Sequence, residues 1–266
     1  MQSKFRDSKK RMKYLIRLMV LSLIFGSGTG ALAQKLKSSI PNELRYKRNI
    51  SVDGELSDWD DTLHYQYEKQ RLQYEIANDD AHIYVAMRVV DIDAQMQALH
   101  QGFSIGINKE GKKKEAASLS FPVPDRESLR SLMAKDNDQR PADMRLGLLK
   151  AVRAFYVYGL VDVVDGPISL DNDYGIRAVV AIDSTDALCY EAVIPLSHLG
   201  IDPETVENVA FNVKINGTML RTVGGAAPMG NRYGGYGYPS AYGRQPLRKE
   251  AQQEPGLWFI LPLAKP

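Results

Sequence analysis

Leu72–Val90, LQYEIANDDAHIYVAMRVV, decides the fold. Leu72–Ala77 and His82–Val90 alternate apolar with polar side chains at a period of two, which is the pattern of strands with one buried face. Asn78-Asp79-Asp80 between them favours a turn. The stretch therefore predicts an antiparallel hairpin. The buried face of its second strand is expected to consist of Ile83, Val85, Met87 and Val89.

Similar strand patterns recur along the chain and bring the expected total to about eight strands. They fall at Asn49–Val52, Gly102–Asn108, Glu115–Phe121, Ile176–Asp183, Ala187–Ile194, Asn208–Ile215 and Leu257–Leu263. Antiparallel strands with one apolar face must cover that face, most often with a second sheet. The sequence thus predicts a mainly β protein, an antiparallel β-sandwich.

Helical patterns are few. Asp93–His100 has room for two turns, Arg126–Ala134 follows the plausible N-cap Asp125, and Met144–Val152 continues the helical pattern. We expect residues 125–152 to be a short helical insertion between strands of one domain, 49–266, with a lead-in at 34–48.

The first 33 residues have the features of a signal peptide. Met1–Lys13 is basic, Tyr14–Phe25 is apolar apart from Arg17, and Ala31-Leu32-Ala33 has the small-x-small pattern of a cleavage site. The apolar run is shorter than the roughly 20 residues that a membrane-crossing helix needs. Cleavage near Ala33 predicts an exported protein, periplasmic or secreted; an uncleaved N-terminal anchor is the alternative.

Charge and cysteine usage exclude several classes of protein. Of the 34 basic and 32 acidic residues, seven and one lie in residues 1–33, which leaves 27 basic and 31 acidic groups in the mature chain. A net charge of −4 gives no electrostatic drive toward nucleic acid. The single cysteine, Cys189, excludes an intrachain disulfide framework and a Cys-rich zinc site. No later stretch is apolar enough to span a bilayer.

Motifs for catalysis are missing from the sequence. It contains no His-Glu-x-x-His run, no Gly-x-Ser-x-Gly elbow, and no dinucleotide or Walker loop. Cys189 lies in the apolar run ALCYEAVI, where a buried thiol behaves as a small hydrophobe. We assign no catalytic residue. A carboxylate pair for hydrolysis stays open, because its separation is a property of the fold.

An acidic run, DGELSDWDD, occupies Asp53–Asp61. Clustered carboxylates are ligands that calcium prefers, but this spacing does not match an EF-hand loop. We interpret the run as an Asx-rich turn that leads into the sheet with Trp59 packed beneath it. Calcium binding is the alternative, with no other cofactor expected and no metal ligand assigned.

Three motifs resemble, in order, the family 9 carbohydrate-binding-module-like domains, which are related to the DOMON sandwiches. They are ISVDGELSDW at Ile50–Trp59, NDDAHIYVAM at Asn78–Met87 and YEAVIPL at Tyr190–Leu196. The longer pattern is also similar to exported proteins of Bacteroidota-type bacteria with no assigned role. The resemblance implies a β-sandwich, and in the family a sugar site with calcium nearby. Sugar-binding members clamp the sugar between tryptophans, whereas Trp59 and Trp258 are here expected in the core.

The segment Val223–Pro246, VGGAAPMGNRYGGYGYPSAYGRQP, is an unusual glycine- and tyrosine-rich loop without acidic residues. Loops of this length in compact domains are commonly functional or disordered. Tyrosine offers a flat apolar face with a polar rim, and arginine offers planar donors for carboxylates. A flexible tether between two strands is the competing interpretation. The candidate ligand-binding residues are Arg232, Tyr233, Tyr236, Tyr238, Tyr242 and Arg244.

These observations favour a non-catalytic exported module that binds a carbohydrate or a glycan of the cell envelope through its loops. The first alternative is an interaction or assembly protein of the envelope that uses the same loop against another protein. The second is a hydrolase with an unrecognised carboxylate pair.

Overall fold

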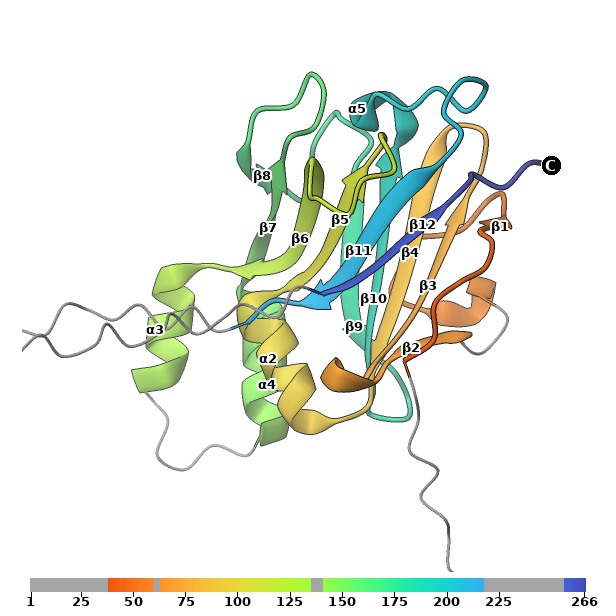
Figure 1. Ribbon diagram of the computed structural model, residues 1–266. Coiled ribbons are helices and arrows are strands. Elements are labelled where there is room, and N and C mark those ends of the chain that lie inside the picture. Colours follow the sequence, from red (N-terminus) through yellow and green to blue (C-terminus); the bar gives the residue numbers. More distant parts are fainter. Residues whose placement is uncertain (1–37, 60–62, 135–140, 218–255) are drawn as a thin grey trace, which may run out of the picture. The chain divides into compact units, whose positions relative to one another are not determined.

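Two six-stranded β-sheets pack against each other around one hydrophobic core (Figure 1). The computed structural model describes residues 38–59, 63–134, 141–217 and 256–266. These residues belong to one compact unit, Lys37–Pro266. All strand pairs are antiparallel except β1 with β3. The predicted antiparallel β-sandwich is therefore confirmed.

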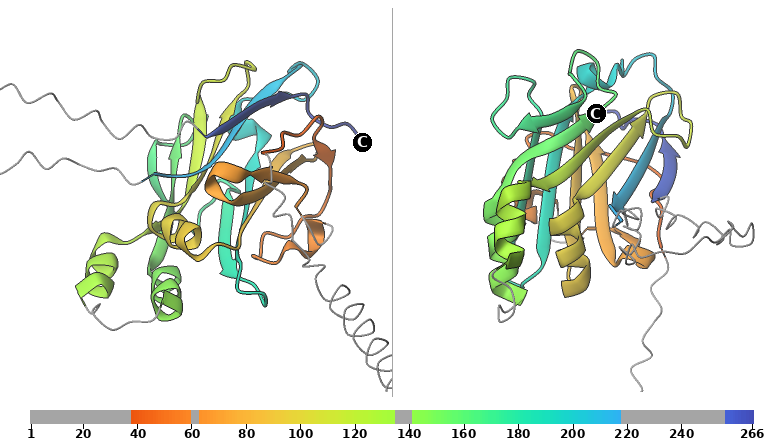
Figure 2. Two further views of the ribbon diagram at one scale, coloured as in Figure 1. Left: turned by 60° about the horizontal axis from the view of Figure 1, so that its bottom comes forward. Right: turned by 90° about the vertical axis from the view of Figure 1, so that its left-hand side faces the viewer.

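Sheet A has the strand order β1-β3-β4-β10-β9, and β2 pairs with β3 beside this path. Its strands are β1 Arg45–Tyr46, β2 Tyr65–Tyr67, β3 Leu72–Asn78, β4 His82–Val89, β9 Arg177–Ile182 and β10 Leu188–Pro195. Sheet B has the order β12-β11-β5-β6-β7-β8 (Figure 2). Its strands are β5 Phe103–Asn108, β6 Ala117–Pro124, β7 Val152–Tyr158, β8 Gly166–Ser169, β11 Val209–Ile215 and β12 Leu257–Leu261.

The hairpin predicted at Leu72–Val90 forms the centre of sheet A as β3 and β4. Its turn is closed by Asp79, whose Oδ1 accepts the backbone N–H groups of Ala81 and His82 at 2.8 and 2.7 Å. The four apolar residues predicted on one face of β4 are all fully buried in the core. The hairpins β5–β6 and β9–β10 and the strands β11 and β12 also form where the sequence predicts them.

The strand predicted at Asn49–Val52 is wrong, because this stretch is irregular. It begins a segment, residues 50–59, that covers the outer face of sheet A; we call it the strap. Backbone groups of the strap form hydrogen bonds to side chains and not to a neighbouring strand. For example, Asp58 Oδ2 accepts the Ser51 N–H at 2.8 Å. A second apolar cluster lies beneath it. Its buried members are Trp59, Leu63, Ala77, Tyr84, Ala86 and Val193.

Four strands of the described residues, β1, β2, β7 and β8, are not among the predicted ones. The clearest omission is β7, VRAFYVY, because its first residue, Val152, is predicted as the end of a helix. The helix instead ends at Ala151. From there Phe155 and Val157 alternate into the core, with no exposed surface. Alternation of this kind specifies a strand with one buried face.

Helices gather at one end of the sandwich (Figures 1 and 2). They are α2 Ile92–Gln101, α3 Arg126–Ala134 and α4 Pro141–Ala151, and short elements occur as α5 Leu196–Leu199, η1 Leu56–Trp59 and η2 Glu68–Gln70. The predicted insertion at 125–152 is confirmed. Its N-cap is Asp125, whose Oδ2 accepts the Ser128 N–H at 2.8 Å. In the described part of the chain, no helix has the length and apolarity needed to cross a bilayer.

Candidate functional site

The six ligand-binding residues predicted from the sequence, Arg232, Tyr233, Tyr236, Tyr238, Tyr242 and Arg244, lie outside the described residues. Their role stays a prediction. The structure does show which strands this part of the chain joins. It leaves sheet B at the end of β11 and returns at the start of β12, and these strands are neighbours in which Val213 pairs with Leu257. The outer face of sheet B is therefore the surface beside both ends of the connection.

The middle of this outer face consists of small residues. In β5, Phe103, Ile105 and Ile107 point into the core, so Ser104 and Gly106 point outward. In β6 the outward residues are Ser118 and Ser120. The register sets Ser104 opposite Ser120 and Gly106 opposite Ser118. The two hydroxyls of the first pair are hydrogen bonded at 3.1 Å.

Two tyrosines border these serines on β7. Because Phe155 and Val157 fill the core, Tyr156 and Tyr158 project from the opposite face, and 46% and 50% of their surfaces are exposed. Their Cα atoms lie about 7 Å apart along the strand. Tyr158 pairs with Ser118 and Tyr156 with Ser120. We call Tyr156, Tyr158, Ser118 and Ser120 the tyrosine–serine surface.

An ion pair extends this surface toward β11. Gly106 leaves space for the Glu115 side chain, since a Cβ at Gly106 would lie 3.1 Å from Glu115 Oε2. The same oxygen lies 3.6 Å from Nζ of Lys214, a residue that pairs with Ser104. Carboxylate oxygens and ammonium hydrogens therefore lie beside the hydroxyls. The surface combines flat apolar rings with donors and acceptors.

Trp258 lies at the far side of the same face, on β12. Its neighbours Phe259 and Leu261 are buried in the core, so Trp258 and Ile260 face outward, and Trp258 is partly exposed. It pairs with Asn212 of β11. The expectation that Trp258 belongs to the core is therefore wrong, because a strand alternates and Phe259 holds the inward position. Trp59, by contrast, is fully buried as expected.

The serines and tyrosines of this face were missed by sequence reasoning. The signal that could have found them is the period of two in Val152–Tyr158, where Tyr156 and Tyr158 share the face opposite Phe155 and Val157. The predicted helix ended at Val152, and residues 153–158 were assigned to no element. The exposure of the two tyrosines follows from the core positions of Phe155 and Val157, which the structure shows.

Two glutamates are fully buried on the outer face of sheet A, one beneath the strap and one beside Arg45 and His64. Glu75 of β3 and Glu191 of β10 both pair with Ala86 of β4, which places their Cα atoms about 10 Å apart. They are carboxylates of the kind that the hydrolase alternative requires. Because neither has exposed surface, a substrate cannot reach them in this structure.

Both buried carboxylates serve as attachment points. Glu191 Oε1 accepts the indole N–H of Trp59, and its Oε2 accepts the backbone N–H of Gly54, each at 2.8 Å. Burial raises the pKa of Glu191, although these donors favour the charged form. Glu75 lies 2.7 Å from His64 Nδ1 and 3.3 Å from Arg45 Nε. The two glutamates therefore hold the segments that cover sheet A.

The residues of the acidic run that the structure describes form a turn, and the cysteine is buried. Asp53 Oδ1 accepts the Glu55 N–H at 2.9 Å, which is an Asx turn above buried Trp59, as predicted. The described residues contain no group of three His, Cys, Asp or Glu placed to hold a metal. Calcium binding stays a prediction, because Asp60 and Asp61 lie outside them. Cys189 is buried, and desolvation raises its pKa to about 12, as does nearby Asp183, which leaves an unreactive thiol.

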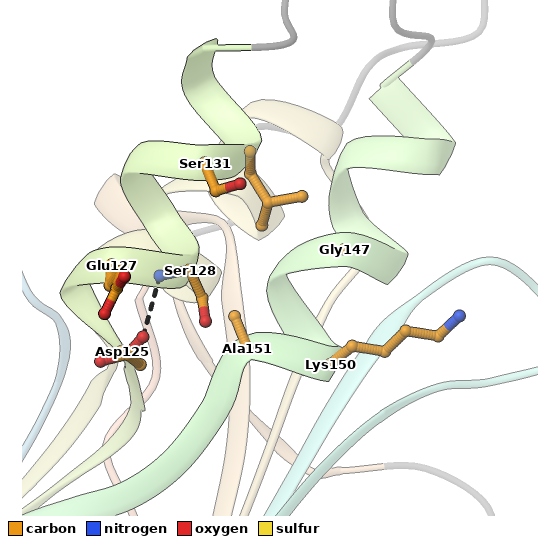
Figure 3. Close-up of a pocket in the computed structure, with 8 residues that line it drawn as sticks. Asp125, Glu127, Ser128, Ser131, Gly147, Lys150 and Ala151 are labelled. Carbon is orange, nitrogen blue, oxygen red and sulfur yellow. Dashed lines mark hydrogen bonds between the residues drawn. The ribbon is translucent and has the colours of Figure 1, made fainter.

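A pocket of about 540 Å³ lies between α3 and α4 in the helical insertion (Figure 3). Asp125, at its base, is engaged as the N-cap of α3. Lys150 extends away from α3 in Figure 3 and so does not converge on the pocket. Leu132 fills the space beside Gly147, where a Cβ would lie 2.7 Å from Leu132 Cδ2. The pocket is therefore a packing gap between two helices and offers few convergent polar groups.

Comparisons with known proteins find similarity to solved structures only. No family model matches the chain, and no curated protein is significantly similar to it. A family 9 carbohydrate-binding module from Caldicellulosiruptor kristjanssonii, solved in complex with glucose, is 14% identical at a TM-score of 0.31. The match covers 66% of this chain and 77% of that chain. At these values the similarity carries no argument about ligand or mechanism. The strand pairing itself defines this chain as an antiparallel β-sandwich.

Proposed function

We propose that the protein is a non-catalytic carbohydrate-binding module that takes its glycan on the outer face of sheet B. The observation that carries the proposal is the half-exposed pair Tyr156 and Tyr158, which stands beside Ser118 and Ser120 in strand register. Large aromatic rings lose apolar burial when they face water, and a sugar ring offers a matching apolar face. Two such rings on one strand form a rigid platform.

The polar groups beside the tyrosines suit a hydroxyl-rich ligand. Lys214 of β11 lies three strands from Tyr156 of β7, across β5 and β6. A glycan that extends from the rings across these strands would meet Glu115, which accepts hydrogen bonds, and Lys214, which donates them. Ser120 is partly exposed and can do both. Orientation by a few polar groups around an apolar contact is the usual design of a small-ligand site.

The loop predicted at 223–246 belongs to the same proposal. Because its chain ends at β11 and β12, its four tyrosines and two arginines are attached to the sheet that bears the tyrosine–serine surface. The loop would add contacts to a bound glycan, and its arginines favour acidic sugars. Calcium, if bound at Asp53–Asp61, has no part in this surface.

The protein is proposed to act outside the cytoplasm. Residues 1–33 support this location through their basic arm, short apolar run and small-x-small end. An exported module meets the glycans of the envelope or of its surroundings. Proteins of the envelope are the alternative partners, through the same loop and the same outer face.

A panel of glycans tested by calorimetry against residues 34–266 checks the proposal. The double variant Tyr156→Ala/Tyr158→Ala is expected to bind at least tenfold more weakly, because each ring contributes on the order of 1 kcal/mol. Tyr46→Ala is the matched control, since Tyr46 lies on sheet A and stacks with Arg48. It should bind as tightly as the unchanged protein.

Deletion of residues 224–245 distinguishes glycan binding by the loop from glycan binding by the outer face of sheet B. If binding survives the tyrosine substitutions but not the deletion, the loop alone is the site and the role of the sheet fails. If no glycan binds and a stoichiometric protein co-purifies, the interaction alternative replaces the proposal. Glycan release from a substrate panel would support the hydrolase and contradict both.

A further inference from the structure

A second pocket lies on the opposite side of the sandwich from the tyrosine–serine surface. On the outer face of sheet A, Arg177 of β9 pairs with Val193 of β10, and Val193 pairs with Tyr84 of β4. Consecutive strands lie about 4.8 Å apart. A guanidinium, an apolar side chain and an aromatic ring therefore follow one another in a single row.

A pocket of about 320 Å³ opens over this row between the sheet and the strap. The strap closes one side, where it is held by the bonds from Ser51 N–H to Asp58 and from Gly54 N–H to Glu191. The volume is at the lower end for small-molecule sites, which suits a ligand of one sugar ring. The lining residues are Ile50, Ser51, Val52, His82, Tyr84, Gly175, Arg177 and Val193.

The charges at this pocket are positive. Arg177 is exposed, and in the described structure its side chain forms neither an ion pair nor a hydrogen bond. None of the residues that line the pocket carries a carboxylate. A guanidinium beside the apolar side chains of Ile50, Val52 and Val193 favours a planar anion, which it binds through two parallel N–H donors.

The ring of His82 is held in place at the same pocket. Its Nδ1 lies 3.2 Å from Asp79 Oδ1, and Asp79 Oδ2 also accepts the Tyr84 hydroxyl at 2.8 Å. This arrangement fixes both rings and leaves His82 Nε2 for a ligand. The Asp79 charge is itself engaged by these donors and by the Ala81 and His82 amides. It lies outside the set of lining residues.

We propose that this pocket binds a small ligand with one sugar-like ring and one carboxylate, such as a hexuronic acid. The carboxylate lies on the Arg177 guanidinium, and the ring packs over Val193 and the edge of Tyr84. Serine and histidine side chains at the rim, Ser51 and His82, bond the hydroxyls. The site lies on sheet A and does not depend on the tyrosine–serine surface of sheet B.

A carboxylate fits better than a phosphate for two reasons. Phosphate sites generally gather several donors from a helix N-terminus or an arginine cluster, whereas this pocket offers one guanidinium. The apolar row beneath Arg177 has no role with a free phosphate. A ring attached to the anion would cover the small part of Val193 and Tyr84 that the second apolar cluster leaves open to the pocket.

Calorimetric titration of residues 34–266 with D-galacturonate and with D-galactose tests the proposal, because the two sugars differ at the carboxylate. Galacturonate is expected to bind at least tenfold more tightly than galactose. Arg177→Gln should weaken galacturonate at least tenfold and leave galactose unchanged. Arg130→Gln, an exposed arginine on α3, is the matched control. Thermal unfolding verifies that each variant is folded.

Amide chemical shifts provide a second measurement, which can be made even when binding is weak. On addition of galacturonate, the largest changes are expected at Tyr84, Arg177 and Val193. Equal affinity of unchanged protein and Arg177→Gln for galacturonate would overturn the proposal. So would no saturation by galacturonate, or tighter binding of inorganic phosphate than of galacturonate. The variant Tyr156→Ala/Tyr158→Ala should bind galacturonate as tightly as the unchanged protein. Failure of the galacturonate proposal can therefore be distinguished from failure of the proposed glycan site on sheet B.

Discussion

The indole N–H of Trp59 donates a 2.8 Å hydrogen bond to Glu191, a residue 132 positions further along the chain. Both partners are fully buried. A buried carboxylate is costly unless donors surround it, so Glu191 requires the strap in place. The bond therefore connects the strap with β10 of sheet A.

Trp59→Phe should destabilise the protein by about 2 kcal/mol, because a buried carboxylate oxygen loses its charged hydrogen bond while the ring still packs. The measurement is urea unfolding followed by circular dichroism. Trp258→Phe is the control, since Trp258 is partly exposed and should change stability much less. Equal losses in the two variants would show that the indole bond adds nothing beyond ring packing.

Asp183 should make stability depend on acid pH. Burial raises its pKa, but bonds from Thr185, the Ala187 amide and Arg88 outweigh burial and bring the pKa to about 2. Because the pKa of Asp183 is lower in the folded than in the unfolded protein, its charge stabilises the fold at pH values above the unfolded pKa of about 3.9. This contribution to stability is lost as the pH falls toward 2. After allowance for solvent screening this amounts to about 1 kcal/mol.

The unfolding free energy of unchanged protein and Asp183→Asn, compared from pH 7 to pH 2.5, measures this contribution. The variant should be less stable at pH 7, and the difference should shrink as pH falls through 4 toward 2. A constant difference across the range would contradict the proposed linkage.

Gly159 and Gly166 provide a matched pair for backbone strain. Both have positive φ, 68° and 136°. A Cβ at Gly159 would lie 2.0 Å from the Ala116 carbonyl oxygen, whereas nothing lies within 4 Å at Gly166. Gly159→Ala is expected to cost about 3 kcal/mol or more, and Gly166→Ala only its φ strain of about 1–2 kcal/mol. Melting temperatures of the two variants rank them, and the reverse order would refute the clash.

Arg145 attaches the helical insertion to the sandwich. Its guanidinium is buried on α4 and donates two bonds to Asp186, at 2.8 and 3.0 Å, and one to Gln95 of α2. Arg145→Met should speed amide exchange in α4 at least tenfold while β3 and β4 keep their protection, because only α4 loses its attachment. Lys150→Met on the same helix is the exposed control. Unchanged exchange in α4 would mean that packing alone holds the helix.

Strand periodicity was sufficient to predict the hairpins β3–β4, β5–β6 and β9–β10, because each has one face in the core. It did not show that the other face of some of these strands is covered as well. β4 and β10 are buried on both faces beneath the strap, so polar positions such as Glu191 look like ordinary solvent-facing residues. A single carboxylate within LCYEAVIP was the available sign of a buried partner.

The candidate sites could be predicted only in part. The exposed tyrosines of β7 lie on a strand that was not predicted, because only its first residue, Val152, was assigned, and to a helix. The row from Arg177 to Tyr84 joins three strands whose register is a long-range property, which no local pattern contains. The signals for the loop at 223–246 were compositional, and they identify residue types without placing them.

The pairing of Val213 with Leu257 has a consequence for how this molecule can diversify. Since the two strands are held side by side by their own ladder, the stretch between them is not needed to align them. Loop closure costs only about 0.6 kcal/mol for each doubling of length. Residues 218–255 can thus be replaced by another sequence without loss of the strand pairing. Variants of this protein with new binding properties are most readily obtained by such a replacement.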